Sequence, residues 1–471
     1  MQVVKNYLYN ASYQIFILLV PLITTPYLAR VLGPTGVGIN AYTNSIIQYF
    51  ILFGSIGVNL YGNRQIAFDR DNKFKLTNTF YEIFIMRIVT ITFAYLVFLI
   101  FLVVIGKYQI FYLAQSVSII AAAFDISWFF MGIENFSVTV LRNFVVKIIT
   151  LICIFSFVKT SADLTAYILI LSLSLLVGNM TLFPSLSKRI GKLHFKNLHI
   201  WQHLVPSITL FVPQIATQIY LVVNKTMLGS MTSVQAAGFF DQSDKMIKIV
   251  LAIVTATGTV MLPHVANAFM KGQISKTKEY LYSSFRFVTI VSIPMMFGMM
   301  AIANKFVPLF FTSSFSAVRP LMMIESLVIL LIAWSNALGT QYLLPTNQNK
   351  AFTTSVILGA IVNIIINIPL ILVWGALGAT IATVLSELTV TTYQLYAVRR
   401  QIDFRKLFKE THKYFVAGLV MFVVVKLIDL KAANSWLMLL GEVFIGMVVY
   451  LLLLLILKVT LISELKKSLK N

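Results

Sequence analysis

The stretch AAAFDISWFFMGIENF, residues Ala121–Phe136, decides the fold, because it combines the composition of a membrane-buried helix with two acids. Asp125 stands in the middle of the apolar run, and Glu134 follows near its end. A charged side chain near the centre of a bilayer costs about 2.5–3.5 kcal/mol on insertion scales. The stretch therefore predicts a membrane helix whose Asp125 carboxylate faces either a cavity or a polar group on another helix.

The whole chain has the same character. Its 471 residues are 59% hydrophobic and only 11% charged, whereas soluble domains are about 45–50% apolar and about 25% charged. Apolar runs of about 20 residues recur from end to end, and each is long enough to cross a hydrocarbon core of roughly 30 Å. Because backbone groups in lipid must be paired within their own segment, these runs are helices. The composition predicts an all-α polytopic membrane protein.

The spacing of the apolar runs predicts about fourteen spans. Their expected centres are Phe16, Ile51, Ala94, Ala122, Ile149, Leu173, Ile215, Val254, Val291, Ile329, Ile364, Val384, Val420 and Tyr450. Lys and Arg concentrate in alternate connections, most densely in residues 187–203 and 399–413. Cytoplasmic loops carry this excess, so we expect a multi-pass protein of the cytoplasmic membrane with both termini inside. The first apolar run lacks a small-residue cleavage site and is expected to be retained.

The two most basic connections divide the chain into three predicted parts. Residues 1–195 would form an N-terminal lobe of six spans, residues 196–400 a second lobe of six, and residues 401–471 two further spans with a cytoplasmic tail. A weak internal sequence similarity between Arg30–Tyr42 and Thr226–Gln242 supports this division. An even number of spans in each half makes such repeats parallel.

Catalytic and metal-binding patterns are missing from the sequence. It contains no GxxxxGK[ST], GxSxG or HExxH pattern, so we expect neither catalytic residues nor an enzyme. Cys153 is the single cysteine, and His199 and His203 lie in a basic loop without nearby acids, so no metal site is expected. That loop is expected to face solvent or lipid. The formal charge of +21 lies in short clusters between apolar runs, a pattern of membrane orientation rather than of nucleic-acid binding.

A charged stripe follows Gly238 in the sequence. Asp241 with Lys245, and Asp244 with Lys248, have i, i+4 spacing with the acid first, so each pair can neutralise itself on a helix. Alternatively, the stripe lines a wet cavity and offers its lysines to an anionic substrate. Both interpretations follow from the spacing.

Three further charges near the opening stretch have simpler expected roles. On a continuous helix, Asp125 would share one face with Trp128 and Gly132. Glu134 is expected at the membrane rim, paired with Arg142. Arg87 is expected to extend its side chain to the membrane surface.

Several segments together resemble a known family. TPYLARVLGPTGVG (residues 25–38) and DISWFFMGIE (residues 125–134) resemble the polysaccharide-unit flippases called Wzx, which belong to the multidrug/oligosaccharidyl-lipid/polysaccharide exporter superfamily. AGFFDQSDK (residues 237–245) and WGALGA (residues 374–379), which leads to Glu387, extend the resemblance over nearly the whole chain. It implies a fourteen-helix transporter in which two six-helix lobes rock around a cationic central cavity.

The resemblance also implies a substrate and partners. The substrate would be an undecaprenyl-pyrophosphate-linked oligosaccharide repeat unit for a capsule, exopolysaccharide or O-antigen-type polymer. Membrane lipids, and the polymerase and chain-length proteins of the same pathway, would be partners. No cofactor is implied, although H⁺ or Na⁺ is a candidate coupling cation.

The predicted site residues fall into two groups. Expected binders of the pyrophosphate are Arg30, Lys225, Lys245 and Lys248, and expected coupling or gating acids are Asp125, Asp241, Asp244 and Glu387. Lys225 is included because the chain departs from the family pattern here: it has Asn224-Lys225 where relatives often carry an acid. This departure weakens a coupling role at that position and leaves more net positive charge.

Three alternatives stay open. A membrane-embedded polymerase or glycosyltransferase would need a long extracytoplasmic loop, and the predicted outer loops are short. A drug exporter or a peptidoglycan-precursor exporter of the same superfamily is opposed by the motif at residues 125–134, through resemblance alone. A non-transporting scaffold would not need charges within its spans.

Overall fold

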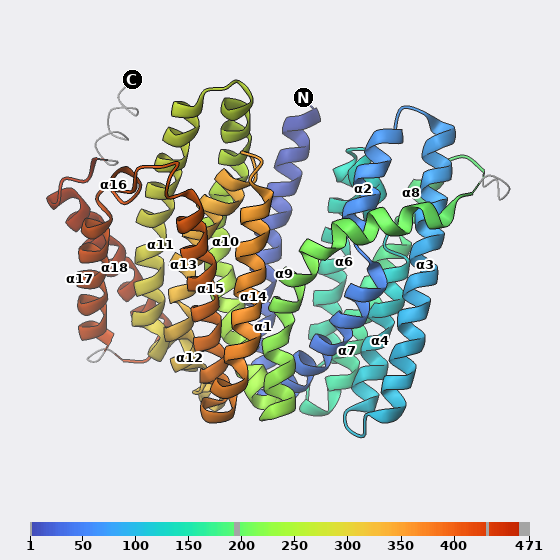
Figure 1. The fold of residues 1–471 in the computed structure, drawn as a ribbon. Coiled ribbons are helices and arrows are strands. Elements are labelled where there is room, and N and C mark those ends of the chain that lie inside the picture. The colour runs from blue at the N-terminus through green and yellow to red at the C-terminus, as the bar shows by residue number, and fades with distance from the viewer. Residues whose placement is uncertain (1, 193–197, 430–432, 461–471) are drawn as a thin grey trace. The chain divides into compact units, whose positions relative to one another are not determined.

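The computed structural model describes residues 2–192, 198–429 and 433–460. Helices and short turns make up this part of the chain, with no β-strand among the described residues (Figure 1). The α-helices are α1 (Gln2–Ser55), α2 (Val58–Asp69), α3 (Lys73–Val104), α4 (Gln109–Ala123), α5 (Ser127–Gly132), α6 (Phe136–Phe157), α7 (Leu164–Met180), α8 (Phe183–Ser187), α9 (Leu204–Met231), α10 (Val234–Met270), α11 (Ile274–Phe310), α12 (Val318–Glu325), α13 (Leu327–Ser335), α14 (Asn349–Trp374), α15 (Ala376–Val398), α16 (Phe404–Leu407), α17 (Thr411–Asp429) and α18 (Trp436–Ile456). A π-helix, Asn336–Leu343, follows α13. The predicted all-α fold is confirmed.

Every expected span centre falls within one of these helices. By length and composition alone, ten helical segments of the described part can cross a membrane, or eleven if the bent pair within α10 is one span. The predicted centres Phe16 and Ile51 both lie in α1, which is counted together with α2 as one segment, Phe16–Asp69. Residues 193–197 of the basic connection 187–203, and the end of the predicted tail from residue 461 onward, lie outside the described residues.

The 54 residues of α1 are interrupted by a break in the helix. At Gly33 the backbone has φ 63° and ψ −179°, so two helices meet there. This conformation is essentially restricted to glycine. Pro34 follows and suits the first turn of the second helix, where its missing N–H costs nothing. Gly33 thus separates the two predicted spans.

Contacts divide the chain into two compact units, residues 1–238 and residues 239–471. The boundary falls inside α10. The three-part division at residues 195 and 400 stays a prediction.

In the first unit, α5 packs closely on α2. A Cβ atom at Gly62 would lie 2.5 Å from the Trp128 ring, and one at Gly132 would lie 2.6 Å from Ile66. Only glycine permits both approaches. Trp128 also stacks on Phe80 with 5.6 Å between ring centroids. This packing holds α5 against α2 and α3, beside the break that carries Asp125.

In the second unit, a buried ion cluster joins α11 to α17 and α18. The Lys305 ammonium on α11 pairs with Glu442 of α18 and lies 3.5 Å from Asp429 of α17. Tyr450 of α18 donates its hydroxyl to the Ile290 carbonyl of α11 at 2.9 Å. These bonds attach the last two long helices to α11.

Candidate functional site

A polar cavity of about 600 Å³ lies within the first unit. Segments of α1 to α7 contribute to its wall. Its polar lining residues are Gln48, Ser55, Asn59, Arg87, Ser118, Asp125, Ser127, Thr139, Arg142, Asn143 and Asn179. Amide, hydroxyl and guanidinium groups therefore converge inside a bundle of apolar helices.

The cavity forms where the opening stretch of the sequence breaks its helix. α4 ends at Ala123 and α5 begins at Ser127, so Asp125 lies in the turn between them. Its Oδ1 accepts a hydrogen bond from the Ser127 N–H at 3.0 Å. The Trp128 indole donates to the Asp125 carbonyl at 3.0 Å. A short acidic side chain competes well with helical bonding at such a turn.

The prediction that Asp125, Trp128 and Gly132 share one helix face is wrong, because the helix breaks between Ala123 and Ser127. The break turns Trp128 and Gly132 toward α2, where they are buried. Of these three residues, only Asp125 lines the cavity, and 20% of its side chain is exposed.

Arg87 of α3 is the buried cation of the cavity. Its Nε donates to the Ala122 carbonyl at 2.6 Å, its Nη1 to Asn59 Oδ1 at 2.6 Å, and its Nη2 to Asp125 Oδ2 at 3.5 Å. The break leaves the last carbonyls of α4 without i+4 partners, and the backbone offers them only turn bonds from the N–H groups of Phe124 and Asp125, at 3.2 and 3.4 Å. Arg87 satisfies one of them, and Asn179 of α7 donates to the Ala121 carbonyl at 2.7 Å.

The expectation that Arg87 reaches the membrane surface is wrong. α3 begins at Lys73, so at 1.5 Å per residue Arg87 lies about 20 Å along the helix. That distance exceeds the reach of its side chain, and the residue is 1% exposed.

Arg142 of α6 brings a second guanidinium to the cavity. Its Nη1 donates to Asn179 Oδ1 at 2.9 Å. Glu134, expected to pair with Arg142, instead forms its ion pair with Arg70 at 2.7 Å. Glu134 is exposed, as a rim residue should be, and the hydrogen bond with its carboxylate raises the pKa of Arg70.

The remaining predicted site residues fall in both units. In the first unit, Arg30 is exposed and donates to the Pro26 carbonyl at 2.8 Å, and Lys225 is half-buried on α9. In the second unit, Glu387 is buried on α15. A single cavity shared by all eight predicted residues stays a prediction.

The charged stripe on α10 forms the expected i, i+4 pairs. Asp241 and Lys245 lie 2.5 Å apart, and Asp244 and Lys248 lie 2.7 Å apart. The lysine side chains keep 42% and 46% of their surface exposed. A further acid, Glu325 at the end of α12, was not predicted from the sequence. It is buried and accepts a hydrogen bond from Ser243, and the sequence signal was a lone acid inside an apolar run.

The loop histidines are placed differently from the prediction. His203 is 4% exposed; its Nε2 lies 2.7 Å from Glu82 and its Nδ1 lies 2.7 Å from the Tyr61 hydroxyl. The backbone N–H of His199 also donates to Glu82, at 2.7 Å. The loop is therefore fastened to α2 and α3, because Glu82 supplies the acid that is absent from the loop.

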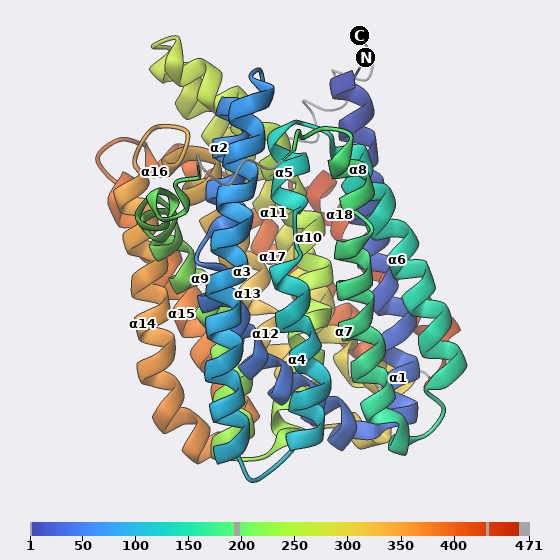
Figure 2. The same ribbon diagram turned by 90° about the vertical axis from the view of Figure 1, so that its right-hand side faces the viewer.

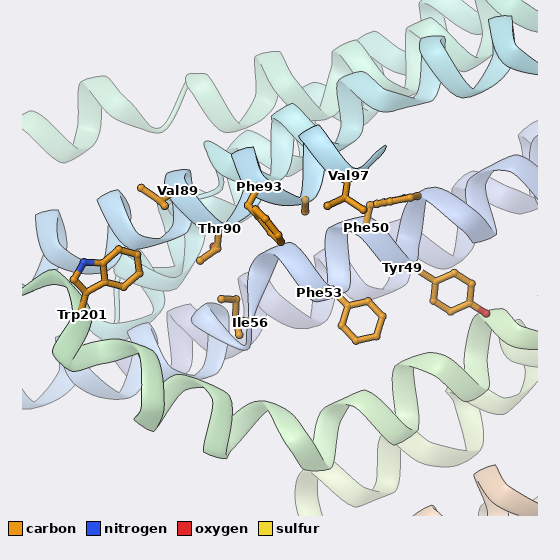
Figure 3. Close-up of a pocket in the computed structure, with 10 residues that line it drawn as sticks. Tyr49, Phe50, Phe53, Ile56, Val89, Thr90, Phe93, Val97 and Trp201 are labelled. Atoms are coloured by element: carbon orange, nitrogen blue, oxygen red, sulfur yellow. The ribbon is translucent and has the colours of Figure 1, made fainter. Parts of the chain in front are cut away.

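An apolar groove of about 580 Å³ lies on another side of α1 (Figure 3). Tyr49, Phe50 and Phe53 of α1 line it together with Ile56, which follows α1, while Gln48, Ile51 and Ser55 of α1 line the polar cavity. Its opposite wall comes from α3 through Val89, Thr90, Phe93, Ala94 and Val97. Figure 3 shows Trp201 at one end and Tyr49 at the other.

Comparison with known proteins identifies the family. The family described as Polysaccharide biosynthesis protein matches residues 3–269, more than half of the chain. The chain belongs to this family. A curated relative, the Putative O-antigen transporter of Escherichia coli K12, is 23% identical over 401 residues, covering 84% of this chain and 96% of the relative. The Probable low-salt glycan biosynthesis flippase Agl15 of Haloferax volcanii is 21% identical over 246 residues, covering 51% of each.

Solved structures agree in fold with this member of the polysaccharide biosynthesis family. Lipid II flippase MurJ, in an inward closed conformation, superposes with a TM-score of 0.75 at 17% identity, covering 97% of this chain and 100% of that one. An inward-facing multidrug resistance MATE family transporter gives a TM-score of 0.63 at 13% identity, covering 81% and 94%. The predicted transporter fold and the resemblance to polysaccharide flippases are confirmed.

Proposed function

We propose that this protein is a flippase, which moves polyprenyl-diphosphate-linked oligosaccharide repeat units across the cytoplasmic membrane by alternating access. The polar cavity of about 600 Å³ is the observation that carries the proposal. Sugar hydroxyls taken out of water need hydrogen-bond partners, and an unpaired buried polar group costs about 1–3 kcal/mol. Asn59 and Asn143 line the cavity and can supply such partners within a helical unit. The names of the relatives, an O-antigen transporter and a glycan flippase, support the same substrate class.

The apolar groove supports a path for the lipid part of that substrate. Its lining is aliphatic and aromatic, and Phe53 and Phe93 are 53% and 70% exposed. A polyprenyl chain can remain in such an environment while the glycan occupies the polar cavity. The two features lie on different faces of the same helix, so one α1 segment would separate the sugars from the lipid.

The proposed diphosphate binders are Arg30, Lys225, Lys245 and Lys248. Lys and Arg bind phosphate through charge-assisted hydrogen bonds. Lys245 and Lys248 each already hold a carboxylate, so a diphosphate would share or displace Asp241 and Asp244. Those two acids, with Asp125 and Glu387, are the proposed coupling or gating groups, and H⁺ or Na⁺ is the candidate cation.

The test is export in cells that lack their own repeat-unit flippase. We expect Lys245→Ala with Lys248→Ala to abolish polymer display, with lipid-linked repeat units accumulating and the protein level in the membrane unchanged. Lys271→Ala with Lys276→Ala is the matched control, because it removes the same charge from exposed lysines of the same unit. Full polymer display in the first variant would contradict the head-group role.

A second assay separates a flippase from a polymerase or glycosyltransferase. Purified protein is placed in vesicles with a fluorescent polyprenyl diphosphate oligosaccharide, and an added glycosidase reports the fraction of substrate on the outer surface. A flippase raises that fraction without changing the length of the glycan. Lengthening of the glycan, or no change in accessibility, would contradict the proposal.

A further inference from the structure

A basic pocket of about 370 Å³ lies in the first unit, apart from both the polar cavity and the apolar groove. Its lining residues are Arg70, Asp71, Lys73, Leu76, Ile133 and Arg189. Four segments meet there: the turn after α2, the start of α3, the residue after α5, and the segment that follows α8. Figures 1 and 2 place α2 and α8 at the same end of this unit.

The pocket has a charged rim and an apolar floor. Arg70, Lys73 and Arg189 are exposed, whereas Leu76 is buried and Ile133 is half-buried. Three cations therefore surround the pocket. Asp71 is the only acid among its described lining residues. This combination suits an anionic group joined to an apolar one.

The pocket lies at one end of two candidate membrane spans. The pocket lies between the end of one candidate span at Asp69 and the start of the next at Lys73. Two large apolar side chains flank this turn and are strongly exposed, Phe68 by 66% and Phe74 by 55%. Aromatic side chains beside Lys and Arg are typical of surfaces that contact lipid at the headgroup level.

The start of α3 adds a fixed positive field. α3 is 32 residues long, and Asn72 caps it by accepting bonds from the N–H groups of Phe74 and Lys75, each at 3.1 Å. The N-terminus of a helix carries partial positive charge and favours anions. The pocket therefore combines this field with three side-chain cations.

One guanidinium of the rim is held in place. Arg70 Nη1 donates to Glu134 Oε1 at 2.7 Å. Glu134 has φ 56°, a left-handed conformation that costs a non-glycine residue about 1–2 kcal/mol. The Glu134 side chain at this position orients Arg70 and leaves the other N–H groups of the guanidinium available.

We propose that this pocket binds the phosphate headgroup of an anionic membrane phospholipid. Arg70, Lys73 and Arg189 donate to the phosphate oxygens, and the glycerol backbone lies over Leu76 and Ile133. Basic pockets between membrane helices bind such headgroups elsewhere. The apolar floor and the exposed phenylalanines favour a lipid over a free phosphate ion. This site does not depend on the proposed transport function.

Binding can be measured by native mass spectrometry of the full chain in detergent, titrated with dioleoyl phosphatidylglycerol. Each surface cation contributes about a fivefold change in affinity. We expect Arg70→Gln, Lys73→Gln and Arg189→Gln together to weaken binding about a hundredfold. The matched control is Arg400→Gln, Arg405→Gln and Lys406→Gln, which removes the same charge from exposed residues of the other unit.

The comparison ligands decide the source of the phosphate. We expect dioleoyl phosphatidylcholine and inorganic pyrophosphate to bind at least tenfold more weakly than phosphatidylglycerol. An equal loss of phosphatidylglycerol binding in both triple variants would show that the lipid is attracted by the surface charge in general, and would overturn the site. Equal binding of phosphatidylcholine would overturn the preference for an anion, and equal binding of pyrophosphate would overturn the assignment to a lipid. A glycan export defect would not by itself affect any of these readings.

Discussion

Arg87 Nη2 lies 3.5 Å from Asp125 Oδ2, and this is the longest of the three bonds that the guanidinium makes. The two shorter bonds go to neutral oxygens, the Ala122 carbonyl and the Asn59 side chain. Neutral partners thus position Arg87, and Asp125 supplies the compensating charge. This division of roles leads to different expectations for the two residues.

Asp125→Asn should impair polymer export more than Glu134→Gln. The asparagine can still accept from the Ser127 N–H, so the turn is retained, but buried Arg87 loses its carboxylate. Glu134 lies on an exposed rim, where an ion pair is worth only about 0–1 kcal/mol. Polymer display, normalised to the amount of protein in the membrane, measures the difference. Wild-type export in both variants would show that Asp125 has a purely structural role.

Arg87→Met should lower the stability of the protein in detergent micelles by about 3–5 kcal/mol, because it leaves a buried partner uncompensated. The exposed Arg64 on α2 provides the control, and Arg64→Met is expected within about 0.5 kcal/mol of wild type. Thermal unfolding followed by tryptophan fluorescence reports both. If the loss of stability in Arg87→Met with Asp125→Asn equals the sum of the losses in the two single variants, the two side chains are not coupled.

His203→Ala should destabilise the first unit, and His199→Ala should not. The His203 ring contacts both Glu82 and Tyr61, so its removal leaves a buried carboxylate short of a partner and costs about 1.5–3 kcal/mol. His199 reaches Glu82 only through its backbone N–H, which alanine keeps. Equal melting temperatures for the two variants would contradict the assigned contacts.

Much of the fold was predictable because its signal is local. Runs of about 20 apolar residues define membrane helices, so each expected span centre, from Phe16 to Tyr450, lies in a helix. The i, i+4 pairs of the stripe on α10 were predictable for the same reason, since a helix brings such residues together by its own geometry.

The cavity was less predictable because distant segments form it. Asp125 attracted attention as an acid in an apolar run, but the break in its helix depends on Arg87 and Asn179, which satisfy the freed carbonyls from other helices. The partner of Glu134 is likewise remote, since Arg70 lies 64 residues away in the sequence. A single sequence gives the polar residues but not their pairing.

Lys305 shows the same limit, and it supports a prediction for the second unit. This lysine stands in an apolar stretch with no acid nearby in the sequence, but it is 1% exposed and pairs with Glu442 and Asp429. Lys305→Met should therefore weaken the attachment of α17 and α18 to α11. Two buried acids would then lack a shared cation, at a cost of about 3–5 kcal/mol.

Lys426→Met is the matched control, because Lys426 also pairs with Asp429, at 3.2 Å, but keeps 24% of its side chain exposed. It should cost no more than about 1 kcal/mol. Limited proteolysis at residues 399–410, which precede α17, measures the attachment. Replacing both partners, Lys305→Met with Glu442→Leu, should restore part of the protection, since a well-packed apolar pair can substitute for a buried ion pair. Equal protection in the two lysine variants would show that packing, rather than the ion cluster, holds these helices.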